Sequence, residues 1–366
     1  MNIGLMKSVD RIAGSLLVNI MSAATACKDI TLHSLLIIRP GGIGDAILLI
    51  PAINALKDKF PDIQITILAE IRNSSAFKLC PFVDEVLHYD KPGELLKALR
   101  GNYDVVIDTE QWHRMSAVVA RLTGAPVSIG YATNERKKLF THPVSYSHDD
   151  YEADSFLSLL APLGIAETSE ITTPFLVVPE TSKNKAATLL ESLECGPFVA
   201  IFPGASIPER RWGSDKFAAV AQRLSAEGVA VVVVGGKGEG ADGDRIIDGR
   251  YGLNLAGKTS LVETAAIIEK SSVLLSGDSG ILHIGVGLGG PTVSLFGPGI
   301  AKKWAPRGDR HIVFNIKLPC SPCTRFGYTP KCPINARCMT DITITEVVAA
   351  VEKLLMENQE RGEAIR

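Results

Sequence analysis

The sequence predicts an α/β protein with two Rossmann-like halves, each built on a doubly wound parallel sheet. Short runs rich in β-branched residues alternate with helical patterns, and the alternation starts again after a polar stretch near the middle of the chain. Several runs are apolar throughout, which is typical of parallel strands covered on both faces. The length of 366 residues also fits two domains of ordinary size.

The first half is predicted from its apolar runs. Strands are expected at 35–39, 63–68, 83–89, 103–108 and 127–130, with amphipathic segments between several of them. Pro51 falls inside the helical pattern that follows the first strand. Because proline has no backbone N–H to donate, we expect it to kink this helix or to delay its start.

The second half follows the polar stretch at 172–185, where we place the boundary between domains. Strands are expected at 198–202, 229–234, 253–256, 273–275, 292–296 and 312–315. Ser260 and Glu263 form a capping-box pattern that opens a helix. The chain is thus divided into an extension (1–33), two domains (34–178 and 179–344) and a C-terminal segment (345–366) that holds an amphipathic helix.

The N-terminal extension has more than one interpretation. An apolar stretch at 12–26 follows two basic residues and resembles a secretory signal, but Asp10 and Asn19 argue against cleavage. The preferred interpretation is an amphipathic helix that lies on a membrane surface. Its apolar face would consist of Leu16, Leu17, Ile20 and Met21. A helix packed on the protein itself explains the pattern equally well.

Composition excludes several classes of protein. With 38 basic and 40 acidic residues the net charge is −2, so no nucleic-acid partner is expected and an anionic partner must meet local patches. Seven cysteines are too few for a disulfide scaffold at this length, which favours reduced thiols in the cytoplasm. A spanning helix is not expected either, because polar residues interrupt every long apolar run.

Glycine-rich turns follow the predicted strands, at the edge where open parallel sheets bind ligands. Gly42 and Gly44 allow a tight turn and let backbone N–H groups face a ligand. Ile47 is too bulky for a dinucleotide fingerprint, so a nicotinamide site is not expected at this turn. Asp45 projects from the strand-to-helix junction, where it can act as a general base or merely cap the helix.

A diphosphate site is indicated in the second half. Gly204 exposes its backbone next to Arg210 and Arg211, and guanidinium groups form bidentate hydrogen bonds with such oxygens. A solvated basic loop with Trp212 buried beneath it is the alternative. Glu239 follows the next strand and can accept hydrogen bonds from ribose hydroxyls.

The turn at Asp278, Ser279 and Gly280 gives a sharp signal, because a strand ends there and a helix begins with N–H groups able to receive an anion. Asp278 can hold sugar hydroxyls or simply act as the N-cap of the helix. His283 is better explained as a core histidine than as a catalytic one.

Together these motifs resemble glycosyltransferase family nine, the heptosyltransferases that add ADP-heptose to the inner core of lipopolysaccharide. The resemblance covers about 35–355. It rests on Gly42-Ile43-Gly44-Asp45 with Pro51-Ala52-Ile53, Pro203-Gly204-Ala205 with Arg210-Arg211-Trp212, Asn254-Leu255-Ala256-Gly257, Gly277-Asp278-Ser279-Gly280 with His283, and Cys320-Ser321-Pro322-Cys323 through Cys338-Met339.

The resemblance implies a GT-B architecture with two domains facing a central cleft, an N-terminal acceptor domain and a C-terminal nucleotide-sugar domain. It implies inverting transfer without a metal or other cofactor, with Asp45 as general base and with Asp278, Glu239 and Arg210 on the donor. Arg210 stands where the family usually has lysine, so the diphosphate contact can differ. A phosphorylated, lipid-linked acceptor at the inner face of the inner membrane should meet cations of the first domain. The candidates are His113, Arg114, Arg136, Lys137 and Lys138, of which the last three can also be an ordinary solvated run.

Other functions remain open. Another nucleotide sugar can replace ADP-heptose within the same family. A protein that binds a nucleotide sugar without transferring it, or a Rossmann oxidoreductase that uses the loop at Gly238, would give Asp45 no role.

Four cysteines cluster near the C-terminus. Cys320, Cys323, Cys332 and Cys338 are spaced C-x2-C-x8-C-x5-C. Four thiolates can hold zinc tetrahedrally, and the first pair has suitable spacing. The other spacings are irregular, so reduced, packed cysteines are favoured over a structural metal.

Overall fold

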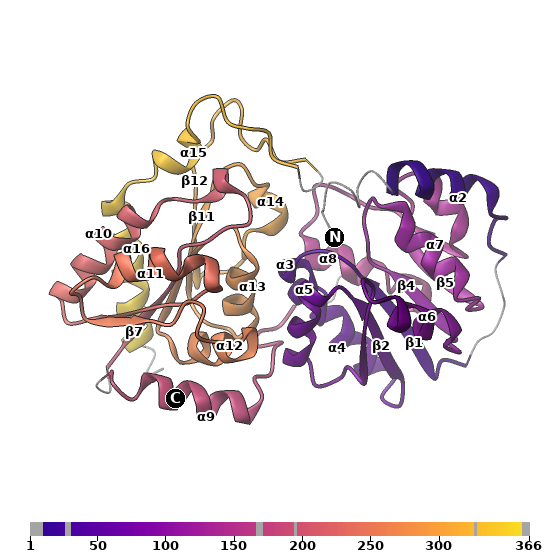
Figure 1. Ribbon diagram of the computed structural model, residues 1–366, viewed down its shortest axis with the longest axis horizontal. Coiled ribbons are helices and arrows are strands. Elements are labelled where there is room, and N and C mark those ends of the chain that lie inside the picture. The colour runs from indigo at the N-terminus through magenta and orange to yellow at the C-terminus, as the bar shows by residue number, and fades with distance from the viewer. Residues whose placement is uncertain (1–9, 26–30, 166–170, 194–195, 326–327, 361–366) are drawn as a thin grey trace. The chain divides into compact units, whose positions relative to one another are not determined.

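The computed structural model describes residues 10–25, 31–165, 171–193, 196–325 and 328–360 (Figure 1). The chain divides into two compact units, Met1–Ile171 (unit 1) and Thr172–Arg366 (unit 2). Among the described residues, every helix is too short or too polar to cross a membrane. Each unit is an α/β fold with a parallel sheet of six strands, as the apolar runs predict.

Unit 1 has the strand order β3-β2-β1-β4-β5-β6, and all of its neighbouring strands run parallel. Its strands are β1 (Ser34–Arg39), β2 (Gln64–Ala69), β3 (Glu85–His88), β4 (Val105–Asp108), β5 (Val127–Tyr131) and β6 (His142–Val144). The predicted strands are confirmed within a few residues at each end. The edge strand β6 was not predicted, because it has three residues and contains Pro143.

Helices of unit 1 connect these strands. They are α3 (Ile43–Leu48), α4 (Ile50–Lys59), α5 (Ile71–Ser74), α6 (Pro92–Arg100), α7 (Arg114–Leu122) and α8 (Glu152–Ser158), with shorter turns at η2 (Ser75–Leu79), η3 (Glu135–Leu139) and η4 (Ala161–Leu163). The structure explains Pro51: the helical pattern breaks at Leu49, and Pro51 lies in the first turn of α4. A proline is tolerated there because that N–H has no partner within the helix.

Unit 2 has the strand order β12-β11-β10-β7-β8-β9, again all parallel. Its strands are β7 (Phe198–Phe202), β8 (Ala230–Val233), β9 (Gly252–Asn254), β10 (Val273–Gly277), β11 (Thr292–Phe296) and β12 (His311–Asn315). Its helices are α9 (Glu180–Leu190), α10 (Ser214–Ala226), α11 (Gly240–Ile247), α12 (Leu261–Lys270), α13 (Gly280–Gly287), α14 (Ala301–Trp304), α15 (Arg337–Thr340) and α16 (Ile344–Glu360), with short turns η5 (Pro208–Arg210) and η6 (Lys237–Glu239).

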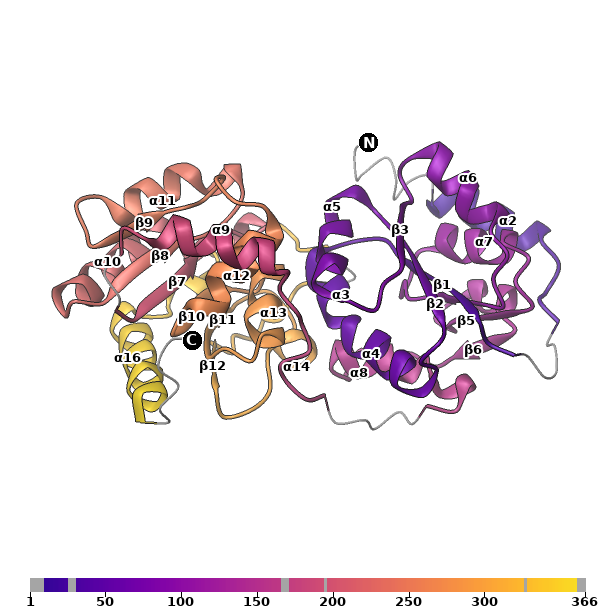
Figure 2. The same ribbon diagram turned by 90° about the horizontal axis from the view of Figure 1, so that it is seen from below.

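Helices cover both faces of the unit 2 sheet. Helices α10 and α16 lie on one face, and α12 and α13 lie on the other (Figure 2). The inward residues of α16 include Val347, Val351 and Leu354, which belong to one core with the valines of β7 and β8. The C-terminal amphipathic helix is therefore confirmed. The capping box at Ser260 is confirmed as well, since its hydroxyl accepts a hydrogen bond from the backbone N–H of Glu263.

The two sheets share one topology. Numbered within its own unit, each has the order 3-2-1-4-5-6 of a Rossmann fold. The direction of winding reverses between β1 and β4 in unit 1, and between β7 and β10 in unit 2. Open sheets of this type bind ligands beyond the carboxyl ends of the strands at this switch point, which directs attention to the residues that follow these four strands.

The N-terminal segment is part of the folded body of unit 1. A π-helical turn η1 (Asp10–Gly14) leads into α2 (Ser15–Ile20), and Val18 is completely buried in the core together with residues of α7. Met21, which was predicted on the outward apolar face, instead packs against this core, because it lies three positions after Val18 on the same side. Leu16, Leu17 and Ile20 are exposed. The segment thus packs on the protein and still presents an apolar face.

Candidate functional site

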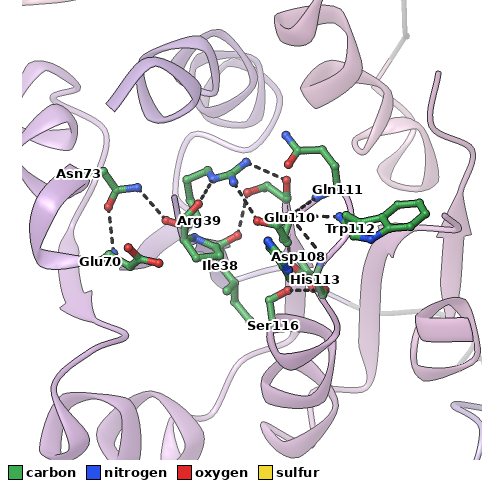
Figure 3. A network of polar contacts seen from close by, with 12 residues as sticks. Ile38, Arg39, Glu70, Asn73, Asp108, Glu110, Gln111, Trp112, His113 and Ser116 are labelled. Atoms are coloured by element: carbon green, nitrogen blue, oxygen red, sulfur yellow. Dashed lines mark hydrogen bonds and ion pairs between the residues drawn. The ribbon is translucent and has the colours of Figure 1, made fainter. Parts of the chain in front are cut away.

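The switch point of unit 1 is occupied by a buried arginine at the end of β1. The Arg39 side chain is about 1% exposed, and its guanidinium donates to the Thr109 carbonyl at 2.9 Å and pairs with the Glu110 carboxylate at 3.3 Å (Figure 3). Its Nε also donates to the Pro40 carbonyl at 2.6 Å. The side chain therefore joins the carboxyl ends of the two strands between which the winding reverses.

A second buried arginine extends this network. Arg136 forms an ion pair with Asp108, with both side chains fully buried, and it donates to the Glu110 carbonyl. Burial raises the pKa of Asp108, although the charge of Arg136 opposes this. For Glu110 the opposing charges prevail: burial acts to raise its pKa, but Arg39 and other cations leave it lowered. The structure thus corrects the solvated-run interpretation of Arg136, whose guanidinium supports the strand ends from within.

Asp45 lies in the first turn of α3, half-buried, three residues after Gly42. Gly42 is the N-cap of this helix and has no side chain with which to cap it. Burial acts to lower the pKa of Arg39, but nearby carboxylates raise it, and Asp45 has the largest effect among them. The Asp45 carboxylate therefore lies within the field of the Arg39 guanidinium. Gly41 makes room for this arrangement: its φ is +112°, and a Cβ would lie 3.1 Å from Arg39 Nη2.

The other predicted acceptor residues are spread over the same loops. Gly42 and Lys137 are exposed, and Gly44 is half-buried. Arg114 is paired with Glu135 at 2.5 Å. His113 contacts Asp10 at 3.4 Å, so both of these side chains already have acidic neighbours within unit 1.

Sequence reasoning missed an aromatic and acidic group beside this network. Tyr146 packs edge-on against Tyr131 at 4.8 Å and against His148 at 5.1 Å between ring centroids. Glu152, which is completely buried, accepts a hydrogen bond from the Tyr146 hydroxyl at 3.2 Å. Only the position of Glu152 in the first turn of α8 gave a signal, and acidic residues are common in such turns for helix stability alone.

In unit 2 an ion pair joins the loops on either side of the switch point. Arg210 Nη1 and Asp278 Oδ2 are 3.0 Å apart, and the side chains are 16% and 7% exposed. Gly299, in the loop after β11, lies against the same carboxylate, and a Cβ there would be 2.1 Å from Asp278 Oδ2. Loops from three strands thus converge on Asp278, which was predicted from the turn alone.

Glu239 lies in the loop after β8, the next strand along the sheet. Its carboxylate accepts a hydrogen bond from Gly236 N–H at 2.9 Å. A Cβ on Gly204 would lie 2.6 Å from Glu239 Oε1, so the loops after β7 and β8 touch here. The structure brings Gly204, Glu239, Arg210 and Asp278 to one edge of the sheet.

Helix α13 begins at this edge, and its N-cap is Ser279. The Ser279 hydroxyl accepts a hydrogen bond from Leu282 N–H at 3.4 Å and contacts the Ser276 hydroxyl at 2.9 Å. The interpretation of Asp278 as the N-cap is therefore wrong. Gly280 is the first residue of the helix. Its position leaves the helix N-terminus next to the Arg210–Asp278 pair.

Trp212, Arg211 and His283 lie where the interpretations as a solvated loop and a core histidine predict them. Trp212 is buried beneath the loop, and its indole N–H donates to the Ile342 carbonyl at 3.1 Å, whereas Arg211 is exposed and donates to the Ala205 carbonyl at 3.2 Å. His283 is 3% exposed, and burial lowers its pKa to about 4. Its imidazole is therefore neutral at physiological pH.

The C-terminal cysteines share one pocket. Its walls include Cys320, Cys323, Cys332 and Cys338. Burial, followed by the charges of the neighbouring thiols, raises the pKa of Cys323 and of Cys338, which favours the protonated thiols. Within the described ranges, no group of three or more histidine, cysteine or acidic side chains is arranged to hold a metal ion.

Comparison with known proteins decides the family. The family model described as glycosyltransferase family 9 (heptosyltransferase) matches residues 93–332. A lipopolysaccharide heptosyltransferase 3 of Escherichia coli is 30% identical over 343 residues, which cover 85% of this chain and 96% of that protein. The chain belongs to glycosyltransferase family 9. It is therefore a glycosyltransferase, which confirms the resemblance and removes the oxidoreductase alternative.

Solved structures agree with the fold of this glycosyltransferase. A family 9 glycosyltransferase from Veillonella parvula has a TM-score of 0.77 and 23% identity, covering 91% of this chain and all of that one. The Escherichia coli ADP-heptose lps heptosyltransferase II has a TM-score of 0.73 and 21% identity, covering 89% and 99%. The segment matched by the family model contains every predicted donor residue, and Asp45 precedes it.

Proposed function

We propose that the enzyme transfers a heptose-type sugar from ADP-heptose to a lipopolysaccharide core acceptor, with inversion and without a metal ion. The observation that carries this proposal is the 30% identity to a lipopolysaccharide heptosyltransferase 3 over nearly the whole of both chains. Structures with related folds include the Escherichia coli heptosyltransferase WaaC with ADP and with ADP-2-deoxy-2-fluoro heptose, which favours the same class of donor. A lipid-linked acceptor would place the reaction on the cytoplasmic side of the inner membrane.

In the proposed mechanism unit 2 holds the donor. Arg210 and the N-terminus of α13 face the diphosphate, Glu239 accepts hydrogen bonds from the ribose, and Asp278 orients Arg210 through their 3.0 Å contact. Arg211 lies on the same loop, exposed and able to turn toward the phosphates. These groups stabilise the negative charge that develops on the leaving ADP, because fixed cations and dipoles need no reorganisation during the reaction.

Asp45 acts on the acceptor in the proposed reaction. Its carboxylate takes the proton of the acceptor hydroxyl while that oxygen bonds to the anomeric carbon of the sugar. The bond between the anomeric carbon and the diphosphate breaks, and ADP leaves with the electron pair. Attack from the face opposite the leaving group inverts the anomeric configuration. Arg39 is the buried cation whose charge Asp45 faces, since Asp45 is the carboxylate that most raises the pKa of Arg39.

The test compares wild type with Asp45→Asn, using ADP-heptose and a lipopolysaccharide core acceptor. A general base contributes about a hundredfold to ten-thousandfold in rate. We therefore expect a loss of this size in kcat, with ADP binding unchanged by calorimetry. The exposed Asp58→Asn on α4 is the matched control and should turn over like wild type. Equal turnover by Asp45→Asn and wild type would remove Asp45 as the base.

Three further measurements test the finer parts of the proposal. Activity should survive EDTA, and NMR of the product should give the anomeric configuration opposite to that of the donor. A panel of other nucleotide sugars should be poorer donors than ADP-heptose. Faster transfer from another nucleotide sugar would contradict ADP-heptose as the donor. The roles of Asp45 and Arg210 would still be decided by their own variants.

A further inference from the structure

The N-terminal segment of unit 1 is fixed in place by contacts at both of its ends. The Asp10 carboxylate accepts hydrogen bonds from the backbone N–H groups of Arg114 at 2.7 Å and Met115 at 2.8 Å. Near the other end, Val18 is completely buried against the α7 core. In both views α2 lies beside α7 (Figures 1 and 2). These contacts determine which side of the segment faces outward.

The outward side carries a stripe of large apolar side chains. Ile12, Leu16 and Ile20 are 69%, 60% and 71% exposed, and Leu17 beside them is 37% exposed. Residues spaced by four lie on one face of a helix. Four of the twelve exposed large apolar side chains among the described residues belong to this short segment, whereas the other eight are scattered over several elements. Exposed apolar side chains that occur singly need no explanation, but a cluster of them does.

Basic residues border the stripe. Lys138 Nζ donates to the Asn19 carbonyl at 3.2 Å, and the Lys138 carbonyl accepts from Ala24 N–H at 2.9 Å, so η3 lies against the end of α2. The neighbouring Lys137 is exposed. The carboxylate of this turn, Glu135, is paired with Arg114. The border of the stripe therefore has a positive balance.

We propose that this stripe, Ile12, Leu16, Leu17 and Ile20 with Lys137 and Lys138, docks on the surface of an anionic phospholipid bilayer. A helix with an apolar side and a basic border lies in the interface, with its apolar side chains below the headgroups. Lysines next to such a helix are attracted to anionic lipids. The inference goes beyond the proposed function, since it involves neither sugar nor nucleotide.

A second copy of the chain fits this surface less well. A symmetric dimer brings the same patch against itself, including its lysines. Like charges would then meet at the border of the interface, whereas anionic headgroups neutralise them. Charge complementarity thus favours the bilayer over self-association.

The test is flotation of the full-length protein with vesicles of phosphatidylethanolamine and phosphatidylglycerol, and with vesicles of phosphatidylcholine alone. We expect wild type to float with the anionic vesicles, less so in high salt because the attraction is screened. The double variant Leu16→Ser/Ile20→Ser should bind at least about tenfold more weakly. Lys137→Glu should weaken binding to the anionic vesicles. The matched control is Ile71→Ser/Met356→Ser, which removes similarly exposed apolar side chains elsewhere and should bind like wild type.

Three results would contradict the proposal. Wild type that stays with the unbound fraction, or equal flotation of wild type and Leu16→Ser/Ile20→Ser, excludes this docking surface. Light scattering that finds a wild-type dimer, dissociated in the double variant, assigns the stripe to a second copy. An unchanged melting temperature shows that the variant is folded. Transfer to a water-soluble acceptor should remain unchanged in it, which separates this inference from the proposed function.

Discussion

Arg210 and Asp278 pair at 3.0 Å across the point where the winding of the unit 2 sheet reverses. In unit 1 the corresponding position holds a second arginine–carboxylate pair, Arg39 and Glu110. The two pairs differ in access: Arg39 is 1% exposed, whereas Arg210 is 16% exposed. A partly open guanidinium can bind a phosphate while it keeps its carboxylate partner, whereas a fully buried one is available only to groups within the fold.

Arg210→Ala should weaken ADP binding. Loss of a charge-assisted hydrogen bond costs about 1.5–3 kcal/mol, which corresponds to roughly tenfold to hundredfold in Kd. Arg210→Lys should retain part of the affinity because it keeps the charge. Calorimetry with ADP measures this, and the exposed Arg223→Ala on α10 is the control. Unchanged ADP affinity in Arg210→Ala would exclude a diphosphate contact.

Arg136→Met should destabilise unit 1 strongly. It leaves the fully buried Asp108 without its ion-pair partner, and an unpaired buried charge typically costs about 3–5 kcal/mol. Urea denaturation measures the loss. Arg114→Met provides the comparison, because its pair with Glu135 is more exposed and should be worth less than about 1 kcal/mol. Similar losses in the two variants would contradict the buried pair.

Asp10→Ala should lower stability in a pH-dependent way. Asp10 caps α7 although it is far from that helix in the sequence, and loss of a cap costs about 1 kcal/mol. Burial acts to raise the pKa of Asp10, but hydrogen bonds from His113 and the backbone leave it below its usual 3.8. The charged carboxylate therefore stabilises the fold above this pH, and the benefit is lost as pH falls through the lowered pKa. Unfolding free energies of wild type and variant should converge in acid; a constant difference would contradict the charge contribution.

His283→Leu should flatten the acid limb of the stability curve. Burial lowers the pKa of His283 to about 4, so the unfolded chain takes up its proton first. Between the usual value of 6.5 and about 4, stability falls by up to about 1.4 kcal/mol per pH unit for this group. The variant should lose that slope, while the similar contribution of the half-buried His311 remains. In NMR spectra of wild type, the His283 ring should not titrate between pH 5 and 8.

Much of the fold could be predicted from local sequence, because parallel strands buried on both faces leave a continuous apolar run such as 198–202. The strand β6 could not, since three edge residues with a proline have no such pattern. The donor residues stay a prediction, which the sequence allows because glycines and charges after a strand indicate a turn at the ligand-binding edge of the sheet. The central cleft that the two domains are expected to face stays a prediction.

The buried charges of unit 1 were beyond local reasoning. Arg136 lies in a basic run that is typical of solvated surface, and its burial becomes clear only from partners such as Asp108, 28 positions away. The same holds for Asp10, because the helix that it caps begins 104 positions later. Contacts between distant segments leave no periodic signal, so the sequence pattern reveals the charged residue but not its partner.

Gly204 leaves the space that the Glu239 side chain occupies. A Cβ on residue 204 would collide with the Glu239 carboxylate, only 2.6 Å from Oε1. An alanine at position 204 should displace the Glu239 carboxylate from its present position, and the proposed ribose contact would then be weakened. A larger residue at position 204 should therefore rarely occur together with glutamate at position 239 in related sequences.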